Sequence, residues 1–381
     1  MIKPNGKQTI EGQLHDLDMI ALYDGAVQGA VALMNMLRRR IDSNVSEVDK
    51  AYWWSRRERV LEEKKELVSN DPVAILAQRD RWDSEMGALI YQQIGDNMSF
   101  TPTPDFIDKE FDAYIRHDVF EGAKFPKSEH PTLVLLGGQP AASKSKAQDA
   151  IIARNPEANL VAITGDEFRP SHPNFEELAV NDPLGMPNET SSISGPLVRR
   201  CLDYAKEHGY SVLLEGTFVN QEMVLETAKE FSEAGYEVQV CAIAVSEDVS
   251  RLSAQARYLQ NTENPFRARW TPPDLHDLAV VNSPGTVAAL EASPYVSRVE
   301  VWNRTKQLYL NDRDSSGRWS REPEAAQVII DERARPIENP KEWLHLYEVN
   351  AVRAAEHRIG RYAGNGNCGS ECNVTGVLAK P

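Results

Sequence analysis

The chain is poor in cysteine and in basic residues, and both shortages narrow its possible functions. Only four cysteines occur among 381 residues, and Cys201 and Cys241 lie in apolar surroundings where a thiol packs as a small hydrophobe, as expected in a reducing compartment. Lysine and arginine number 42 against 57 aspartates and glutamates, giving a net charge of −15. This balance disfavours broad electrostatic binding to nucleic acid or anionic membranes, so we expect small-molecule or protein partners.

Long apolar runs are also absent. No stretch approaches the roughly 20 apolar residues that a membrane helix requires, and the opening residues, MIKPNGKQTIEGQLHDLD, contain no apolar segment resembling a secretory signal. A hydrophobic fraction of 41% is nevertheless enough to build buried cores. We therefore expect a cytoplasmic, globular protein of two or three domains.

The two remaining cysteines, Cys368 and Cys372, lie in a Gly- and Asn-rich segment near the end of the chain, GNGNCGSECNVTG. Common zinc sites pair their cysteines at tighter spacings, and a metal here would need further ligands from elsewhere. We expect residues 351–381 to hold the end of a helix followed by a flexible tail.

The first 95 residues are predicted to form a helical bundle. Apolar residues recur at three- and four-residue steps between Leu17 and Ile41, which gives one apolar face. A second helix is predicted through VSEVDKAYWWSRRERVLEEKKELV and a third through PVAILAQRDRWDSEMGALIYQQI. Three antiparallel helices with short turns form a small bundle. Pro102 and Pro104 then mark a domain boundary, because proline interrupts a helix.

Beyond this boundary the pattern changes to short apolar runs separated by helix-length segments. The runs are TLVLLG, NLVAITGD, YSVLLEGT and YEVQVCAIAV, and the intervening segments include SGPLVRRCLDYAKEHG and NQEMVLETAKEFSEAG. Such alternation is typical of a parallel sheet with crossover helices, so we predict a three-layer α/β domain. Ligands in these folds bind at the carboxyl ends of the strands, where the sequence has GGQP, TGDEFR and EGT.

The stretch GGQPAASKSK, residues 137–146, lacks one of the two glycines that define a phosphate-binding loop. Gly138, Lys144 and Ser145 are in register with G-x-x-x-x-G-K-[ST], but Ser143 stands where the second glycine is usual. The predicted strand before the loop and helix after it would direct backbone N–H groups at phosphate, with Lys144 on the terminal phosphates and Ser145 on Mg²⁺. The alternative is a plain strand-to-helix turn with a solvated lysine. The predicted cofactor-binding residues are Gly138, Ala141, Ala142, Ser143, Lys144, Ser145 and Lys146.

Acidic residues follow two of the other predicted strands. Asp166 is either a helix N-cap or a general base that takes a proton from a substrate hydroxyl, and we prefer it to its neighbour Glu167 as the base. Arg169 and His172 are candidates for neutralising anionic groups, with a structural role as the alternative for the histidine. Glu215 has apolar neighbours, so its charge calls for a partner, which is either a substrate group or an internal salt bridge.

Arginines downstream of the sheet complete the candidate set. Arg257, Arg267 and Arg269 occur in QARYLQ and FRARWTPPDLHD. Guanidinium groups suit phosphoryl oxygens, where charge accumulates during transfer, although surface arginines are common. The residues alone therefore indicate a phosphoryl-transfer enzyme that uses ATP and Mg²⁺.

The order of these motifs resembles the zeta toxin family, the kinases of bacterial epsilon/zeta toxin–antitoxin systems. The matching pieces run from FTPTPDFIDKEF through LLGGQPAASKS, ITGDEFRPSHP, LLEGT, GYEVQVCAIAV, QARY and RARWTPPDLHD to LYLNDRD. The resemblance implies a P-loop kinase domain over residues 96–350. It also implies phosphorylation of the sugar 3′-hydroxyl of UDP-N-acetylglucosamine, which starves peptidoglycan synthesis.

The resemblance also implies roles for individual positions. Lys144 and Ser145 match the phosphate-loop lysine and the Mg²⁺ ligand, and Asp166 matches the catalytic base. Glu215 and Thr217 match residues that hold the nucleotide sugar, and Arg169 and His172 stay candidate substrate-binding residues from their place beside Asp166. Arg257 and Arg269 match the arginines that clamp the ATP phosphates.

Departures from the family pattern affect the phosphate loop and the substrate positions. Ser143 replaces the loop glycine, Arg199 stands where the family often has a substrate-binding acid, and Phe218 and Val219 stand where a basic side chain is frequent. The acceptor is therefore UDP-N-acetylglucosamine, a related nucleotide sugar or another nucleotide such as NAD. A degenerate P-loop module that binds without chemistry is the other reading.

The helical segment 1–95 lies outside the zeta-like region. An antitoxin of this family is also helical, so we expect this segment to act as an antitoxin in cis, in addition to or in place of one in trans. A packing extension or a dimerisation module is the alternative, because helical bundles host many functions.

Overall fold

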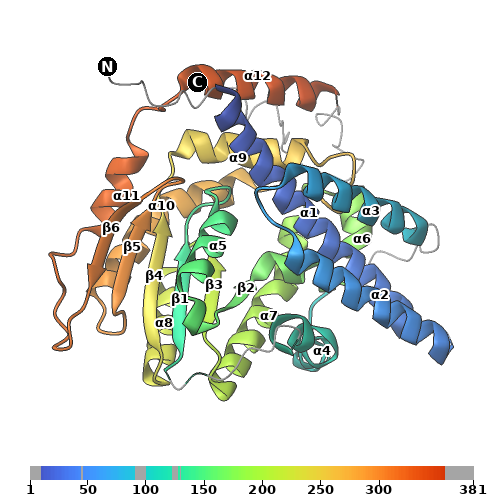
Figure 1. Ribbon diagram of the computed structural model, residues 1–381, viewed down its shortest axis with the longest axis horizontal. Coiled ribbons are helices and arrows are strands. Elements are labelled where there is room, and N and C mark those ends of the chain that lie inside the picture. The colour runs from blue at the N-terminus through green and yellow to red at the C-terminus, as the bar shows by residue number, and fades with distance from the viewer. Residues whose placement is uncertain (1–9, 44–45, 91–99, 122–127, 129, 357–381) are drawn as a thin grey trace, which may run out of the picture. The chain divides into compact units, whose positions relative to one another are not determined.

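The computed structural model describes residues 10–43, 46–90, 100–121, 128 and 130–356, as Figure 1 shows. The predicted tail with Cys368 and Cys372 lies outside these residues. The chain divides into two compact units. The first combines Met1–Ile94, Leu252–Trp270 and Ile337–Pro381, and the second combines Gly95–Arg251 and Thr271–Pro336. In the described part of the chain, no helix has the length and apolar character needed to cross a membrane.

The second unit is built on a six-stranded sheet with the order β2-β3-β1-β4-β5-β6 (Figure 1). All neighbouring strands pair in parallel except β5 and β6, which pair antiparallel. The predicted α/β class and its four apolar strands are confirmed, whereas β5 and β6 were not predicted. The strands are β1 (Thr132–Gly137), β2 (Val161–Thr164), β3 (Val212–Gly216), β4 (Glu237–Ile243), β5 (Arg298–Trp302) and β6 (Gln307–Asp312).

Side-chain alternation along the strands divides the core of this unit between the two faces of the sheet. One face packs with Leu133 and Leu135 against α7, α8, α10 and α11. The opposite face packs with Val134 and Leu136 against α5. The helices of the unit are α4 (Pro104–Glu110), α5 (Lys144–Arg154), α6 (Phe175–Asn181), α7 (Met186–His208), α8 (Gln221–Glu233), α10 (Pro273–Ala292) and α11 (Ala325–Arg333), with short π and 3₁₀ segments η1 (Phe111–Ile115), η2 (His117–Glu121), η3 (Pro156–Ala158) and η4 (Gly165–Ser171).

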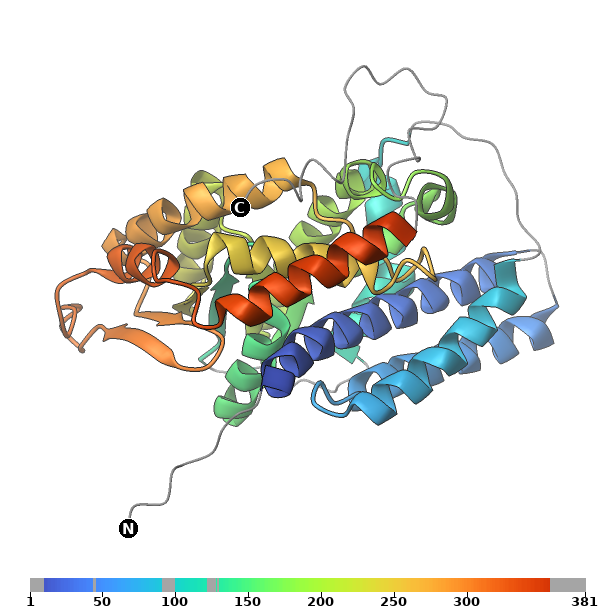
Figure 2. The same cartoon turned by 90° about the horizontal axis from the view of Figure 1, so that it is seen from above.

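The first unit contains the three predicted N-terminal helices, α1 (Ile10–Asp42), α2 (Glu47–Glu66) and α3 (Pro72–Ile90), which lie along one another in Figure 2. The C-terminal half of α9 (Glu247–Leu259) and α12 (Pro340–Glu356) belong to the same unit. Leu252 and Ala256 of α9 pack with Leu346 of α12.

Helix α1 is buried on more sides than its predicted single apolar face. The predicted positions Val31, Met34 and Leu37 are buried, and the small residues Ala26 and Ala30 are buried as well. The side chains of Leu17 and Ile20 lie outside the described residues. Because α1 contacts α2, α3 and α12, small residues fill positions that a solvent-facing helix would give to polar side chains.

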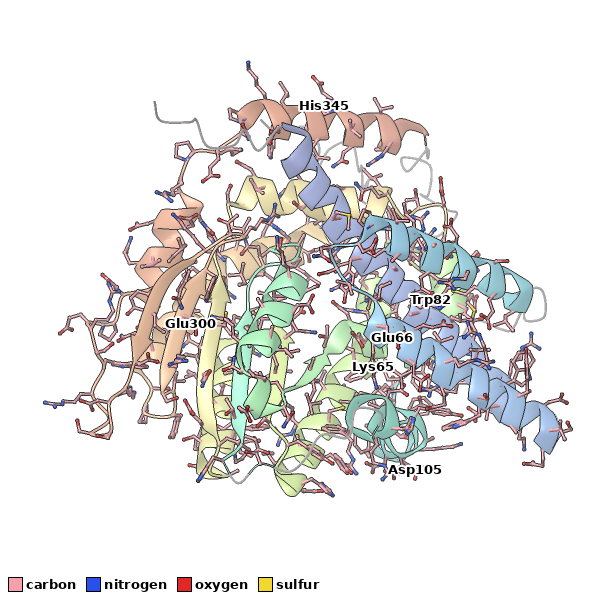
Figure 3. All side chains as sticks on the ribbon, viewed as in Figure 1. Lys65, Glu66, Trp82, Asp105, Glu300 and His345 are labelled. Atoms are coloured by element: carbon pink, nitrogen blue, oxygen red, sulfur yellow. The ribbon has the colours of Figure 1, made fainter. Side chains whose placement is uncertain are left out.

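A charged and polar cluster fastens α2 to α3. The guanidinium of Arg56 donates to Glu85 at 2.8 Å and to Glu63 at 3.2 Å. Glu63 also accepts from the indole N–H of Trp82 at 2.8 Å, a fully buried side chain that Figure 3 labels on α3. These contacts fix the pairing of the two helices, because the only hydrogen-bond donor of the buried Trp82 finds its acceptor on α2.

Candidate active site

The carboxyl ends of β1, β2 and β3 bring three of the predicted polar segments to one edge of the sheet. In the strand register, Gly137 pairs with Gly216, and Thr164 pairs with Glu215. The loop after β1, the η4 segment after β2 and the residues after β3 therefore start at the same edge. This is where ligands bind in open α/β sheets.

The loop between β1 and α5 has a strained backbone. Ala141 and Ser143 have φ values of 58° and 75°, in the left-handed region that non-glycine residues rarely adopt. Helix α5 begins at Lys144, so its first N–H groups face the loop, and Ser145 lies in that first turn. Ala142 is buried and Lys146 is exposed. The predicted strand, turn and helix are thus all present, with no glycine at position 143.

Lys144 and Glu215 lie together at the centre of this edge. The Lys144 ammonium donates to the carbonyl oxygens of Gly138 at 3.1 Å and Gln139 at 3.2 Å, and it lies 3.7 Å from a carboxylate oxygen of Glu215. Lys144 is only 8% exposed, which excludes the alternative of a solvated lysine. The internal salt bridge considered for Glu215 is present, and it places the carboxylate beside the loop.

Asp166 is held by Arg169 within the η4 segment. The Arg169 Nε donates to Asp166 Oδ1 at 2.6 Å, and its Nη1 donates to Thr190 Oγ1 of α7 at 3.1 Å and to the carbonyl of Pro187. Burial lowers the pKa of Arg169 to about 10, which leaves it charged at neutral pH. Arg169 therefore orients the carboxylate of Asp166. Thr190, which the sequence did not single out, supports that arrangement.

His172 has structural contacts. It is buried, its Nδ1 accepts from the backbone N–H of Asn174 at 3.2 Å, and its ring meets Phe100 edge to face with centroids 5.3 Å apart. These contacts match the structural alternative for this histidine. Its ring fixes the turn that follows η4.

The residues after β3 shape the edge with an aromatic ring. Thr217 is half-buried, and Phe218 follows it with φ of 57° and is buried. The Phe218 ring lies so close to Gly137 that a Cβ at that glycine would stand 2.1 Å from it. Gly137 is therefore required by this close approach. An apolar ring fills the place where the family resemblance expects a basic side chain.

Arg199 of α7 lies away from this edge. Its guanidinium pairs with Asp203 of the same helix at 3.0 Å and with Glu230 of α8 at 2.8 Å, and its side chain is half exposed. These partners explain why an arginine at this position is well accommodated in the fold.

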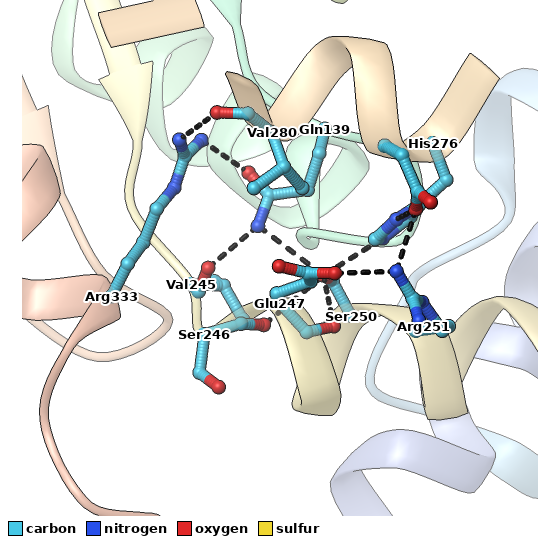
Figure 4. Close-up of polar contacts among 10 residues, drawn as sticks. Gln139, Val245, Ser246, Glu247, Ser250, Arg251, His276, Val280 and Arg333 are labelled. Atoms are coloured by element: carbon cyan, nitrogen blue, oxygen red, sulfur yellow. Dashed lines mark hydrogen bonds and ion pairs between the residues drawn. The ribbon is translucent and has the colours of Figure 1, made fainter. Parts of the chain in front are cut away.

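A buried network that the sequence did not reveal anchors the loop between β1 and α5 (Figure 4). Gln139 is fully buried, and its amide donates to the carbonyl of Val245 at 2.6 Å and to Ser250 Oγ at 3.2 Å. Its amide oxygen accepts from Arg333 of α11 at 2.6 Å. His276 of α10 lies 3.0 Å from the same Ser250 hydroxyl, and burial lowers its pKa. The network joins the loop to α9, α10 and α11, far apart in sequence, so no local pattern indicates it.

A second missed contact comes from the turn between β5 and β6. Arg304 donates to the carbonyl oxygen of Ala141 at 3.0 Å. This bond holds the peptide group between Ala141 and Ala142 in place, where the loop makes its left-handed turn. Arg304 and Gln139 thus fix the two ends of the loop.

Replacing Gln139 by Leu is expected to destabilise the fold by about 2 kcal/mol, because buried partners of the amide lose a hydrogen bond. The loop would lose its anchor, and ATP binding is expected to weaken by about tenfold. Chemical unfolding and calorimetric ATP titration measure the two effects. Gln327→Leu makes the same change on the exposed face of α11 and is expected to stay within about 0.5 kcal/mol. Equal ATP affinity in both variants would contradict an anchoring role.

The residues at this edge fit a polyphosphate better than a metal held by protein alone. The first turn of α5 and the Lys144 ammonium supply positive potential for phosphate oxygens. No group of three or more His, Cys, Asp or Glu side chains in the described residues could hold a metal. The Ser145 hydroxyl in the first turn of α5 is the residue that could contribute a protein ligand to Mg²⁺, an ion that usually keeps several waters and phosphate oxygens as ligands.

The three predicted arginines belong to the first unit, where two of them meet carboxylates of the N-terminal helices. Arg257 of α9 lies 3.5 Å from Asp24 of α1, and Arg267 lies 3.0 Å from Asp83 of α3. Burial lowers the pKa of Arg269, and the carboxylate of Asp24 opposes that shift. Each of these arginines therefore interacts electrostatically with a carboxylate from the predicted helical bundle.

Helix α1 packs closely along this arginine-bearing segment. A Cβ at Gly25 would stand 2.3 Å from the side-chain oxygen of Asn261, so the close approach requires glycine. The Asn261 amide donates to the carbonyl of Ala21 at 3.4 Å and to that of Arg257 at 2.8 Å. The carboxylate of Asp24 and the arginine are thus brought together by backbone packing.

Comparison with known proteins agrees with this geometry. The sequence model of the family described as Zeta toxin matches residues 117–315. Toxin zeta of Streptococcus pyogenes is 29% identical over 202 residues, covering 52% of this chain and 70% of that protein. Toxin PezT of Streptococcus pneumoniae serotype 4 is 28% identical over 214 residues, covering 56% and 84%. Residues 10–90 lie outside the range that the family model matches.

A solved structure from the PezAT chromosomal toxin-antitoxin system of Streptococcus pneumoniae has the same fold. It superposes with a TM-score of 0.55 at 26% identity and covers 68% of this chain and 98% of that chain. The likeness in fold therefore spans nearly the whole of that chain.

Proposed function

Because the chain belongs to the zeta toxin family, we propose that it is an ATP- and Mg²⁺-dependent kinase that phosphorylates a sugar hydroxyl of UDP-N-acetylglucosamine or a related nucleotide sugar. Zeta toxins are kinase-type toxins, which supports phosphoryl transfer as the chemistry. The observation that carries the proposal is the convergence of the buried Lys144 with the half-buried Asp166 and Glu215 at the carboxyl ends of three adjacent strands. The toxic effect would follow from consumption of a precursor that the cell wall requires.

The side chains of the second unit would divide the work of transfer. Lys144 would exchange its two carbonyl acceptors for phosphate oxygens. Asp166, oriented by Arg169, would accept the proton of the attacking hydroxyl. Glu215 and Thr217 would hold the nucleotide sugar so that this hydroxyl lies in line with the transferred group. The resemblance to the family supports each of these roles.

ATP and Mg²⁺ would bind at the loop between β1 and α5, with Ser145 on the metal. Bound there, the nucleotide supplies the phosphoryl group and the metal neutralises charge on its oxygens. The family resemblance assigns Arg257 and Arg269 of the first unit to the ATP phosphates, a role that suits guanidinium groups. A cation set of this kind stabilises the charge that develops during transfer.

The test is to incubate the purified chain with ATP, Mg²⁺ and separate UDP-sugars and to follow phosphorylated product by mass spectrometry. The proposal expects a phosphosugar that disappears in Lys144→Ala. NAD belongs in the same panel. Product from NAD alone would reassign the acceptor, and tight ATP binding without any product would indicate a binding module.

A different nucleotide acceptor is the second candidate, and Phe218 favours it. The ring of Phe218 covers Gly137 at the site edge, and Arg199 is committed to Asp203 and Glu230. Neither position offers the acid or the base that the family resemblance expects for UDP-N-acetylglucosamine. A pocket altered at these positions would favour another nucleotide sugar or NAD, because substrate choice depends on such contacts.

We further propose that residues 1–95 act as an antitoxin in cis. The support comes from the first unit alone, where Asp24 meets Arg257 and favours the charged form of Arg269. A carboxylate on a phosphate-clamping arginine occupies the group that a phosphate oxygen needs. The helical bundle would therefore restrain the kinase by competing with ATP for its arginines.

The pair of Asp83 and Arg267 is not a strong source of stability. Burial raises the pKa of Asp83, although Arg267 and the amide of Asn264 oppose the shift, and burial lowers the pKa of Arg267. A carboxyl group whose pKa is raised on folding stabilises the fold at low pH. This contribution is lost as the pH rises above the pKa that the group has in the unfolded chain. At neutral pH this pair therefore contributes little to the stability of the fold, as is common for buried ion pairs.

A further inference from the structure

The serine in place of the second loop glycine has an unusual combination of backbone and side chain. Ser143 is the N-cap residue of α5 with φ of 75° and ψ of 38°. A side chain in this left-handed conformation is strained, and glycine would adopt it freely. Strained residues of this kind persist where the surroundings or a ligand require them.

The hydroxyl of Ser143 is buried without a partner. The residue is 6% exposed, and its Oγ makes no hydrogen bond. Serine at an N-cap ordinarily accepts from an N–H of the first turn, as Ser46 does from the N–H of Asp49. Ser143, in its left-handed conformation, makes no such bond. The position thus combines strain with an unsatisfied polar group, and both disfavour the fold relative to glycine.

From these observations we propose that the Ser143 hydroxyl donates to a phosphate oxygen of the bound nucleotide and adds a side-chain ligand to the loop. This inference rests on the proposed function, since it takes a nucleoside polyphosphate as the ligand. The hydroxyl stands at the N-terminus of α5, next to Lys144, where an anionic oxygen is favoured. A hydrogen bond to a charged oxygen satisfies the orphan group and compensates for the strain.

Three variants separate the hydroxyl from the backbone strain. Ser143→Gly removes both, Ser143→Ala removes only the hydroxyl, and Ala141→Gly removes left-handed strain from the same loop without touching a hydroxyl. Without nucleotide, Ser143→Gly is expected to melt about 2 °C or more above the parent protein. In calorimetric titration with Mg²⁺, both Ser143 variants are expected to bind ATP and ADP about tenfold more weakly than the parent protein. Both Ser143 variants should also bind ATP and ADP more weakly than the Ala141→Gly variant does.

The outcomes decide between the inference and the function on which it rests. If Ser143→Gly binds ATP as tightly as the parent protein or more tightly, the hydroxyl is not a ligand, and the inference is wrong while the kinase proposal stands. If the parent protein itself binds neither ATP nor ADP, the proposed function fails and the inference with it. Adenosine, which lacks phosphate, is expected to bind equally to all forms; an equal loss with adenosine would mean that the substitution distorts the site as a whole.

Discussion

Replacing Asp166 by Asn is expected to lower the rate of phosphoryl transfer by about 10²–10⁴-fold, the range of a lost general base. The amide keeps the shape of the side chain but cannot accept the proton of the attacking hydroxyl. Arg169 retains its bonds to Thr190 and to the carbonyl of Pro187, so the segment should stay in place. Single-turnover transfer measures the rate, and calorimetry with ATP checks that binding is within about threefold of the parent value.

The neighbouring acid provides the matched control for this experiment. Glu167→Gln removes the same charge one residue along the η4 segment. We expect its transfer rate to remain within about threefold of the parent rate, because a proton must be accepted within hydrogen-bond reach of the acceptor. A large loss in Glu167→Gln together with full activity in Asp166→Asn would move the base to Glu167. Full activity in both variants would show that neither carboxylate acts as the base.

The sequence predicts the part of the fold that local patterns encode. The strands β1 to β4 lie in mainly apolar runs bounded by turn residues, since both faces of a parallel sheet are covered, and each was predicted where it occurs. Helix α5 follows the loop as expected and spans Lys144–Arg154. The carboxyl-edge arrangement of the loop, Asp166 and Glu215 then follows from topology alone.

Strands β5 and β6 escaped prediction because their residues are mixed in character. β5 buries the carboxylate of Glu300, which Figure 3 labels, and this group accepts from Trp302 at 2.5 Å and from Arg154 of α5 at 3.4 Å. β6 lies at the edge of the sheet and alternates buried with exposed residues. A charged residue interrupts the apolar run that identifies a buried strand, and its partner is distant in sequence.

Contacts between distant segments account for the rest of what was missed. Gln139 meets Arg333 across 194 positions, and Asp24 meets Arg257 across 233. Periodicity reports only which face of a helix is apolar, so it cannot name the partner of a carboxylate on that helix. From sequence alone, the acidic residues of α1 and α3 therefore look like solvent-exposed charges, and only the fold shows that they pair with arginines.

Replacing Asp24 by Asn is expected to increase kinase activity at limiting ATP by about tenfold, provided that the helical bundle restrains the arginines. The carboxylate lies 3.5 Å from Arg257 and also favours the charged form of Arg269. A hydrogen bond to a charged group is worth about 1.5 kcal/mol or more, which corresponds to roughly tenfold in ATP affinity. Steady-state kinetics should show the gain as a lower KM for ATP with kcat little changed.

Point variants test this restraint more sharply than removal of residues 1–95. Helix α1 covers Asn261, against which its residues Ala21 and Gly25 pack. Deletion would therefore expose an apolar face of the first unit. Loss of activity in the truncated chain would then report misfolding. Asp24→Asn keeps the helix and its packing, and thermal unfolding of the full chain shows whether the fold is retained.

The control for Asp24→Asn lies on the same helix. Asp42 ends α1, pairs with Arg38 at 3.5 Å and is about half exposed, so Asp42→Asn removes an equal charge away from residues 252–270. If Asp42→Asn raises activity as much as Asp24→Asn, the effect is a general one of net charge, and the specific pairing has no inhibitory role. A lower KM in Asp24→Asn alone would mean that ATP and the carboxylate compete for one guanidinium. The chain would then restrain its own kinase through the same arginines that the reaction needs.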